Sequence, residues 1–254
     1  MDFQIGDVVN RTFGAISRNF VTFVLLSAVL VGVPALALGF VQLGVGSGDV
    51  SNIWTLFGLA LIVNLAATYV LQGALIHGAV LDFNGKKASF GECLATGLKH
   101  MLPLIAIALL MWIGVMFGMM LLIVPGVILS IMWTVAIPAR VVENVGVFKA
   151  FGRSRDLTRN NRWKIFGLFV MYMIIATVIT MVVMLPAGAF APVAAPTEAD
   201  PLGIGQTSVA FVIFNVISTV LAAVVSATGV SAIYYELRKS KEGVGAEELA
   251  KVFE

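Results

Sequence analysis

The densest group of chemically active side chains is a basic stretch at residues 147–164. Its six cationic residues face a single acid, Asp156, so six positive charges and one negative give the stretch +5. The six are Lys149, Arg153, Arg155, Arg159, Arg162 and Lys164. At an anionic membrane surface, attraction to lipid phosphates is worth about 1 kcal/mol per basic residue. These residues are therefore candidates for a lipid-headgroup site at the membrane interface.

Side chains that could carry catalysis or hold a metal are few and scattered. His77 and His100 stand apart, Cys93 is the single cysteine, and neither a His-Glu-x-x-His motif nor a glycine-rich phosphate loop occurs. Glu143 follows Arg140 closely, and we interpret the two as an ion pair at a membrane end. The sequence therefore predicts no enzyme, no cofactor and no metal site.

The composition indicates that most of the chain is surrounded by lipid. Hydrophobic residues make up 59% of the sequence and charged residues 12%, against about 45–50% and about 25% in ordinary globular domains. A water-exposed fold could not cover this excess of apolar surface. We therefore expect an all-α integral membrane protein, with residues 1–254 forming a single polytopic domain.

Six apolar blocks approach or exceed the length of about 20 residues that crosses a bilayer as a helix. They lie at residues 20–40, 53–80, 101–124, 127–142, 165–185 and 208–235. The fourth block is the shortest, and the Pro125-Gly126 pair before it predicts a tight turn between the third and fourth helices. None of the blocks carries Asp, Glu, Lys or Arg in its central part.

The basic residues are distributed in a way that predicts the orientation. All 16 Lys and Arg residues lie in the N-terminal segment, at 81–100, at 139–164 or in the C-terminal tail. The intervening segments 41–52, 125–126 and 186–207 contain none. Because basic loops stay in the cytoplasm, we expect both termini on the cytoplasmic side.

A threefold pattern accompanies this charge distribution. The pairs Phe13-Gly14, Phe90-Gly91 and Phe151-Gly152 each open a polar, amphipathic run that leads into an apolar block. This pattern predicts three transmembrane hairpins, each preceded by an amphipathic interfacial helix. The alternative is that the Phe-Gly pairs coincide by chance.

Three segments carry a family resemblance: IVPGVILSIMWTVAIPARVVE at 123–143, KAFGRSRDLTRNNRWKIFGL at 149–168 and YYELRKSKEG at 234–243. Together they resemble bacterial six-helix proteins, namely the membrane domain of glycerophosphoryl diester phosphodiesterases and the YciC-like inner-membrane proteins. The resemblance implies a multi-pass protein of the bacterial inner (plasma) membrane whose activity is uncharacterised. It implies no phosphodiesterase activity, because no family catalytic residue maps onto this chain and we expect no catalytic barrel.

Polar residues inside the apolar blocks, chiefly Asn64, Gln72 and Asn215, have two interpretations. Such groups bond neighbouring helices together, or they line a path for a substrate. The spacings Gly114-x-x-x-Gly118 and Ala74-x-x-x-Gly78 predict close helix contacts within or between subunits.

Two hypotheses for function follow. The first is a non-enzymatic accessory or scaffold factor that contacts anionic lipids and a membrane-protein partner or a second copy of itself, without binding nucleic acid. The alternative is a transporter or channel for a neutral or lipid-like substrate, lined by the intramembrane asparagines and the region of Pro125 and Pro138.

Overall fold

The computed structural model describes residues 3–45, 53–190 and 209–243, and within these ranges it contains helices and no strand. The helices are α1 (Ile5–Arg18), α2 (Phe20–Ser27), α3 (Val33–Val45), α4 (Ile53–Phe83), α5 (Phe90–Leu121), α6 (Ile123–Trp133), α7 (Ala136–Glu143), α8 (Val147–Thr158), α9 (Arg162–Phe190) and α10 (Val209–Glu242). A π-helical turn at Ala28–Gly32 joins α2 to α3.

Six helical stretches in the described part of the chain are long and apolar enough to cross a membrane. They are Phe20–Gly39, Gly58–Phe83, Phe90–Leu121, Ile123–Glu143, Arg162–Val182 and Val209–Glu242. The predictions of an all-α fold and of six candidate spans are thereby confirmed. This arrangement is that of a multi-pass membrane protein.

The start of the third span differs from the prediction. The amphipathic run that Phe90-Gly91 opens is not a separate interfacial helix, because it forms the start of α5, which runs unbroken from Phe90 into the span. The Ser89 side chain caps α5 by accepting a hydrogen bond from the Glu92 amide. Pro103 lies inside α5 without ending the helix, and extending an existing helix costs far less than starting a new one.

The connection between the third and fourth spans also differs. The chain turns at Leu122, whose extended backbone (φ −162°, ψ 148°) separates α5 from α6. Pro125 and Gly126 lie in the first turn of α6 rather than in the turn itself. Proline is well accommodated there, because the first amides of a helix have no intrahelical partner to lose.

The fourth span is two helices, α6 and α7, interrupted at Thr134 and Val135. At the other end of the chain, α10 continues through Glu242 into the segment predicted as a charged tail. The remainder of that tail, and most of the loops predicted at 41–52 and 186–207, lie outside the described residues.

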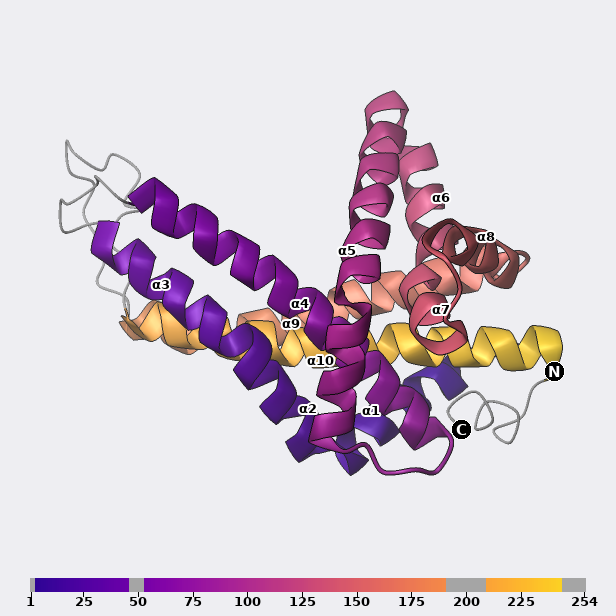
Figure 1. Cartoon of the computed structure of the whole chain (residues 1–254), viewed down its shortest axis with the longest axis horizontal. Coiled ribbons are helices and arrows are strands. Elements are labelled where there is room, and N and C mark those ends of the chain that lie inside the picture. Colours follow the sequence, from indigo (N-terminus) through magenta and orange to yellow (C-terminus); the bar gives the residue numbers. More distant parts are fainter. Residues whose placement is uncertain (1–2, 46–52, 191–208, 244–254) are drawn as a thin grey trace.

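Three helix pairs extend in different directions from a shared region (Figure 1). The pairs are α3 with α4, α5 with α6, and α9 with α10, and the members of each pair pack against one another. We call the shared region the hub; it comprises α1, α2, α7, α8 and the ends of α4, α5 and α10 that contact them. Buried side chains concentrate in the hub, whereas the apolar outer surfaces of the pairs are exposed, as lipid-facing helices are.

Small residues allow the helices to approach closely. A Cβ atom on Gly97 of α5 would lie 2.2 Å from the Val70 carbonyl oxygen of α4. A Cβ on Gly118 would lie 2.9 Å from the Gly126 Cα, and one on Gly114 would lie 2.5 Å from the Trp133 ring. The predicted role of Gly114-x-x-x-Gly118 in close packing is confirmed, and the contact is within the subunit.

The Ala74-x-x-x-Gly78 spacing behaves in the same way. Ala74 is fully buried. A Cβ on Gly78 would lie 2.8 Å from the Phe23 ring and 3.1 Å from Cys93 Sγ. This contact is also within the subunit, and it closes the hub between α2, α4 and α5.

Ionic contacts attach α1 to the rest of the hub. The helix buries Val8 and Thr12 on the face that contacts α10. Arg11 forms an ion pair with Glu236 of α10, and its guanidinium lies 4.5 Å from the centre of the Tyr235 ring.

At the C-terminal end of α1, Arg18 Nε donates to Asp82 Oδ1 of α4 at 3.0 Å, and this hydrogen bond raises the pKa of Arg18. Asn19 Nδ2 also donates to Asp82 Oδ1, at 2.7 Å. The amphipathic helix is thus held at its middle and at its C-terminal end by charged partners from distant parts of the sequence.

Candidate functional site

The amphipathic character of α8 determines where the predicted basic residues lie. The helix follows Asn144, which ends α7 in the left-handed conformation (φ 49°), and its N-cap is Gly146. Ala150, Ser154 and Leu157 recur at helical spacing and are buried. Of the basic residues on this helix and just after it, Lys149, Arg155 and Arg159 are exposed, whereas Arg153 is half-buried.

Two hydroxyl groups hold α8 against the interruption of the fourth span. Ser154 Oγ donates to the Met132 carbonyl oxygen at 2.8 Å, and Thr158 Oγ1 donates to the same oxygen at 3.4 Å. This carbonyl lies near the end of α6, where helix carbonyls lack intrahelical donors. The hydroxyls of α8 therefore satisfy a backbone group at the break and fix α8 beside it.

The chain turns sharply between α8 and α9. Asn160 adopts the left-handed conformation with φ 71°, which asparagine tolerates better than most residues. The Asn161 amide donates to the Thr158 carbonyl at 3.1 Å, and α9 begins at Arg162. The turn therefore places the end of one basic helix next to the start of another.

A hollow of about 570 Å³ lies at this turn. It is lined by Gly152, Arg155, Asp156, Arg159, Asn160, Arg162 and Trp163. Three guanidinium groups and one carboxylate give this lining an excess of positive charge. We call these seven residues the arginine corner.

The arginine corner has donors suited to phosphate. Guanidinium groups present several N–H donors in a planar fork that matches phosphate oxygens. The Nε of Arg162 is buried and, within the described part of the chain, has no hydrogen-bond partner. Trp163 is 86% exposed, as aromatic residues at a membrane interface are. The corner could therefore bind an anionic group at the point where α9 enters its apolar stretch.

The structure divides the six predicted headgroup residues. Arg155, Arg159 and Arg162 line the arginine corner. Lys149 is exposed on α8 outside it. Lys164 Nζ donates to the Phe3 carbonyl oxygen at 3.0 Å and so joins α9 to the N-terminal segment.

Arg153, the sixth, is engaged in ion pairs inside the hub. Its Nε donates to both carboxylate oxygens of Glu143, each at 2.9 Å. It also pairs with Glu242, which accepts from Arg238 Nε at 2.9 Å. Tyr234 Oη donates to Glu143 Oε1 at 2.7 Å. These five residues form an ionic network that joins α7, α8 and α10.

The ionic network corrects the expected partner of Glu143. Arg140 does not pair with Glu143; its Nη1 donates instead to Asn144 Oδ1 at 2.7 Å and to the Val145 carbonyl oxygen at 3.0 Å. The side chain of Arg153, from the next helix, takes the place beside Glu143. The sequence contains one signal for this pairing. Glu143 lies in the basic segment 139–164, where an acid needs a cationic partner.

The predicted intramembrane polar residues occupy less distinctive positions. Asn64 and Gln72 of α4 are half-buried, and Asn215 of α10 is exposed. None of the three lines the arginine corner or the apolar hollow described below. A polar contact between helices does occur nearby, where Thr180 Oγ1 and Ser218 Oγ lie 3.5 Å apart across α9 and α10. Such contacts join helices in lipid.

Comparison with known proteins identifies a family. Residues 59–237, well over half of the chain, match the family described as "Domain of unknown function (DUF7847)", and the chain belongs to that family. These comparisons show no link to the glycerophosphoryl diester phosphodiesterases or to the YciC-like proteins. No curated protein and no solved structure matches the chain.

Proposed function

We propose that this member of the DUF7847 family is a non-enzymatic accessory or scaffold factor of the bacterial inner (plasma) membrane that binds anionic phospholipid headgroups. In this proposal its helices form three transmembrane hairpins, each preceded by an amphipathic segment, and both termini lie in the cytoplasm. The distribution of all 16 basic residues along the sequence supports this orientation.

One observation carries the proposal: three arginines and an exposed tryptophan surround an open hollow where α9 enters its apolar stretch. A phosphate at this position would meet guanidinium donors while its acyl chains ran alongside the apolar residues of α9. Anionic lipids are the nearest partner of such a site, because the corner is directly continuous with a candidate span.

The test compares the lipids that surround two variants of equal charge. The full chain is reconstituted in mixed phosphatidylglycerol and phosphatidylcholine, and extracted with the lipids that surround it. The lipid ratio is then measured by mass spectrometry. One variant replaces Arg155, Arg159 and Arg162 by glutamine. The other replaces the exposed Lys86, Lys87 and Lys149 by glutamine, and so removes three charges elsewhere.

We expect the arginine variant to lose most of the enrichment in phosphatidylglycerol and the lysine variant to keep most of it. Three basic residues contribute at most about 3 kcal/mol, which corresponds to about a hundredfold in affinity. An equal loss in both variants would show that the attraction is diffuse. No enrichment in the unaltered protein would remove the lipid part of the proposal.

A second function, movement of a lipid-like substrate, is favoured by the interruption between α6 and α7. Interrupted membrane helices occur at the substrate sites of transporters, and Thr134 at this break lines an apolar hollow. Reconstituted vesicles carrying a fluorescent phospholipid would test it. Protein-dependent movement of the lipid between leaflets would support transport, and its absence would leave the scaffold function.

A further inference from the structure

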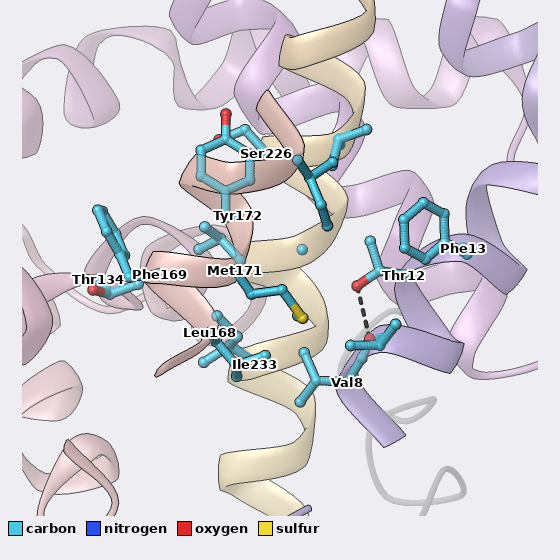
Figure 2. Close-up of a pocket in the computed structure, with 15 residues that line it drawn as sticks. Val8, Thr12, Phe13, Thr134, Leu168, Phe169, Met171, Tyr172, Ser226 and Ile233 are labelled. Carbon is cyan, nitrogen blue, oxygen red and sulfur yellow. Dashed lines mark hydrogen bonds between the residues drawn. The ribbon is translucent and has the colours of Figure 1, made fainter. Parts of the chain in front are cut away.

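A partly enclosed apolar hollow of about 120 Å³ lies between α1, α9 and α10, separate from the arginine corner (Figure 2). Val8 and Thr12 contribute to it from α1, Leu168 and Met171 from α9, and Ser226 and Ile233 from α10. Thr134, at the break between α6 and α7, completes one side.

The lining offers hydrocarbon to a ligand even where it contains hydroxyl residues. Thr12 Oγ1 donates to the Val8 carbonyl oxygen at 2.7 Å, as Figure 2 shows. Thr134 Oγ1 donates to the Ser130 carbonyl oxygen, also at 2.7 Å. Both threonine hydroxyls are thus occupied within their own helices, and of the fifteen lining residues only Tyr172 and Ser226 carry further hydroxyl groups. This largely hydrocarbon lining favours an apolar ligand, because a polar ligand would lose most of its hydration and gain few hydrogen bonds in return.

The size of the hollow suits part of one hydrocarbon chain. An engineered apolar cavity of about 150 Å³ in another protein stays dry and binds benzene. A hollow of about 120 Å³ therefore holds a short run of methylene groups, and it cannot enclose a whole lipid.

The depth of the hollow points to the same ligand. Along α9 its lining begins at Leu168 and ends at Ile175. At 1.5 Å per residue these positions lie about 9 and 20 Å from Arg162 along the helix axis. One leaflet contributes about 15 Å of hydrocarbon to a bilayer. The hollow therefore begins among the acyl chains of the leaflet next to Arg162 and extends to about the bilayer midplane.

We infer that this hollow binds one acyl chain of an anionic phospholipid from the leaflet next to the basic side of the protein. Lys164 lies one turn before Leu168 on the same face of α9, and its ammonium, held near the Phe3 carbonyl oxygen, provides the cation for the lipid phosphate. The inference goes beyond the proposed headgroup contact, because the hollow can bind a chain even if the arginine corner binds nothing.

Gly229 of α10 allows the hollow to be filled selectively. It lines the hollow, and the nearest atom to a Cβ placed on it would be Thr12 Cγ2, 4.0 Å away. A Gly229→Leu side chain would therefore enter the hollow without displacing the backbone. Gly167→Leu is the matched control, because a Cβ at Gly167 meets nothing within 4 Å and the residue does not line the hollow.

The probe is phosphatidylglycerol with a photoreactive diazirine in one acyl chain, incorporated into nanodiscs with the full chain. After illumination, the labelled positions are mapped by mass spectrometry. The exposed face of α5 around Leu109 and Phe117 serves as a reference for ordinary surrounding lipid. In the unaltered protein we expect labelling at 168–175 and 225–233 to exceed that of the reference face.

Gly229→Leu should reduce labelling of the hollow at least about tenfold, since a few methylene groups can no longer be buried there. Gly167→Leu should leave it unchanged, and neither variant should alter the reference face. Ser226→Leu, which also fills the hollow, provides the same test if Gly229→Leu does not fold. Labelling of the hollow that persists in a folded filling variant, or that never exceeds the reference face, would overturn the inference.

The arginine variants separate this inference from the proposed function, and a phosphatidylcholine probe tests the role of Lys164. If the hollow is labelled and the arginine variants do not change lipid enrichment, the chain site stands and the arginine corner fails. If the arginine variants lose enrichment while the hollow is not labelled, the reverse holds. A preference of the hollow for phosphatidylglycerol that is lost in Lys164→Gln would confirm the role of Lys164, and equal labelling by both probes would refute it.

Discussion

Replacing Glu143 by alanine should destabilise the protein more than any other single change in the ionic network. Glu143 accepts two hydrogen bonds from Arg153 and one from Tyr234. The replacement leaves the fully buried Tyr234 hydroxyl without this acceptor. It also leaves Arg153, whose side chain is 27% exposed, dependent on Glu242 alone for its ion pairs.

The magnitude follows from these contacts. A hydrogen bond to a charged group contributes about 1.5–3 kcal/mol, and a buried hydroxyl without a partner costs about 1–3 kcal/mol. Because Arg153 keeps Glu242 and meets some solvent, we expect a total near the lower end, about 3 kcal/mol. Glu143→Gln keeps one acceptor oxygen and should cost about 1 kcal/mol. Glu242→Gln, at a position 28% exposed, should cost at most about 1 kcal/mol.

The assay is reversible unfolding in mixed micelles with increasing denaturing detergent, followed by helical circular dichroism. The expected order of destabilisation is Glu143→Ala, then Glu143→Gln, then Glu242→Gln. A double-mutant cycle between Glu143 and Arg153 measures their coupling directly. A loss below about 1 kcal/mol for Glu143→Ala, or an equal loss for Glu242→Gln, would refute the view that Glu143 is the centre of the network.

Other predictions concern single contacts. Gly97→Ala should destabilise the protein by about 3 kcal/mol or more in the same assay, since its Cβ would meet the backbone of α4. Gly91→Ala is the control and should not destabilise the protein, because a Cβ there meets open space. Equal effects of the two changes would contradict the close crossing of α4 and α5. Ser154→Ala should cost about 1 kcal/mol through loss of the bond to Met132; no change would mean that the bond contributes nothing. A variant with Trp163 as its single tryptophan should be quenched more strongly by lipids brominated near the glycerol than near the chain end, and the reverse order would place Trp163 deeper than the interface.

The number of candidate membrane spans could be predicted from the sequence because the lipid bilayer imposes one simple requirement. A run of about 20 apolar residues is a helix in a bilayer, where every backbone group needs a partner within the helix. The break at Thr134 and Val135 had a signal in the sequence, because Pro138 has no amide to donate to the Thr134 carbonyl four residues earlier and its ring crowds that carbonyl. The contacts of Ser154 and Thr158 with the Met132 carbonyl could not be predicted, because they come from another helix.

The candidate site was predictable only in part for a related reason. The sequence shows which residues of 147–164 are basic, and helical spacing predicts that they are exposed as a group. The arginines of the arginine corner belong to that group. Helical spacing does not show that Arg153 turns inward, since its partner Glu242 lies on the last described helix. The apolar hollow is likewise assembled from three helices whose proximity no local pattern records.

The pairing of α1 with α10 has a consequence for the time course of assembly. Arg11 and Glu236 are 225 residues apart in sequence, and α1 finds its main packing partner only in the last described helix. At about 5–20 residues per second of synthesis, α1 waits about 11–45 s for that partner. Throughout this interval its apolar face needs another cover, which the membrane surface can provide. Of the described helices, the one made earliest is thus among the last to reach its final contacts.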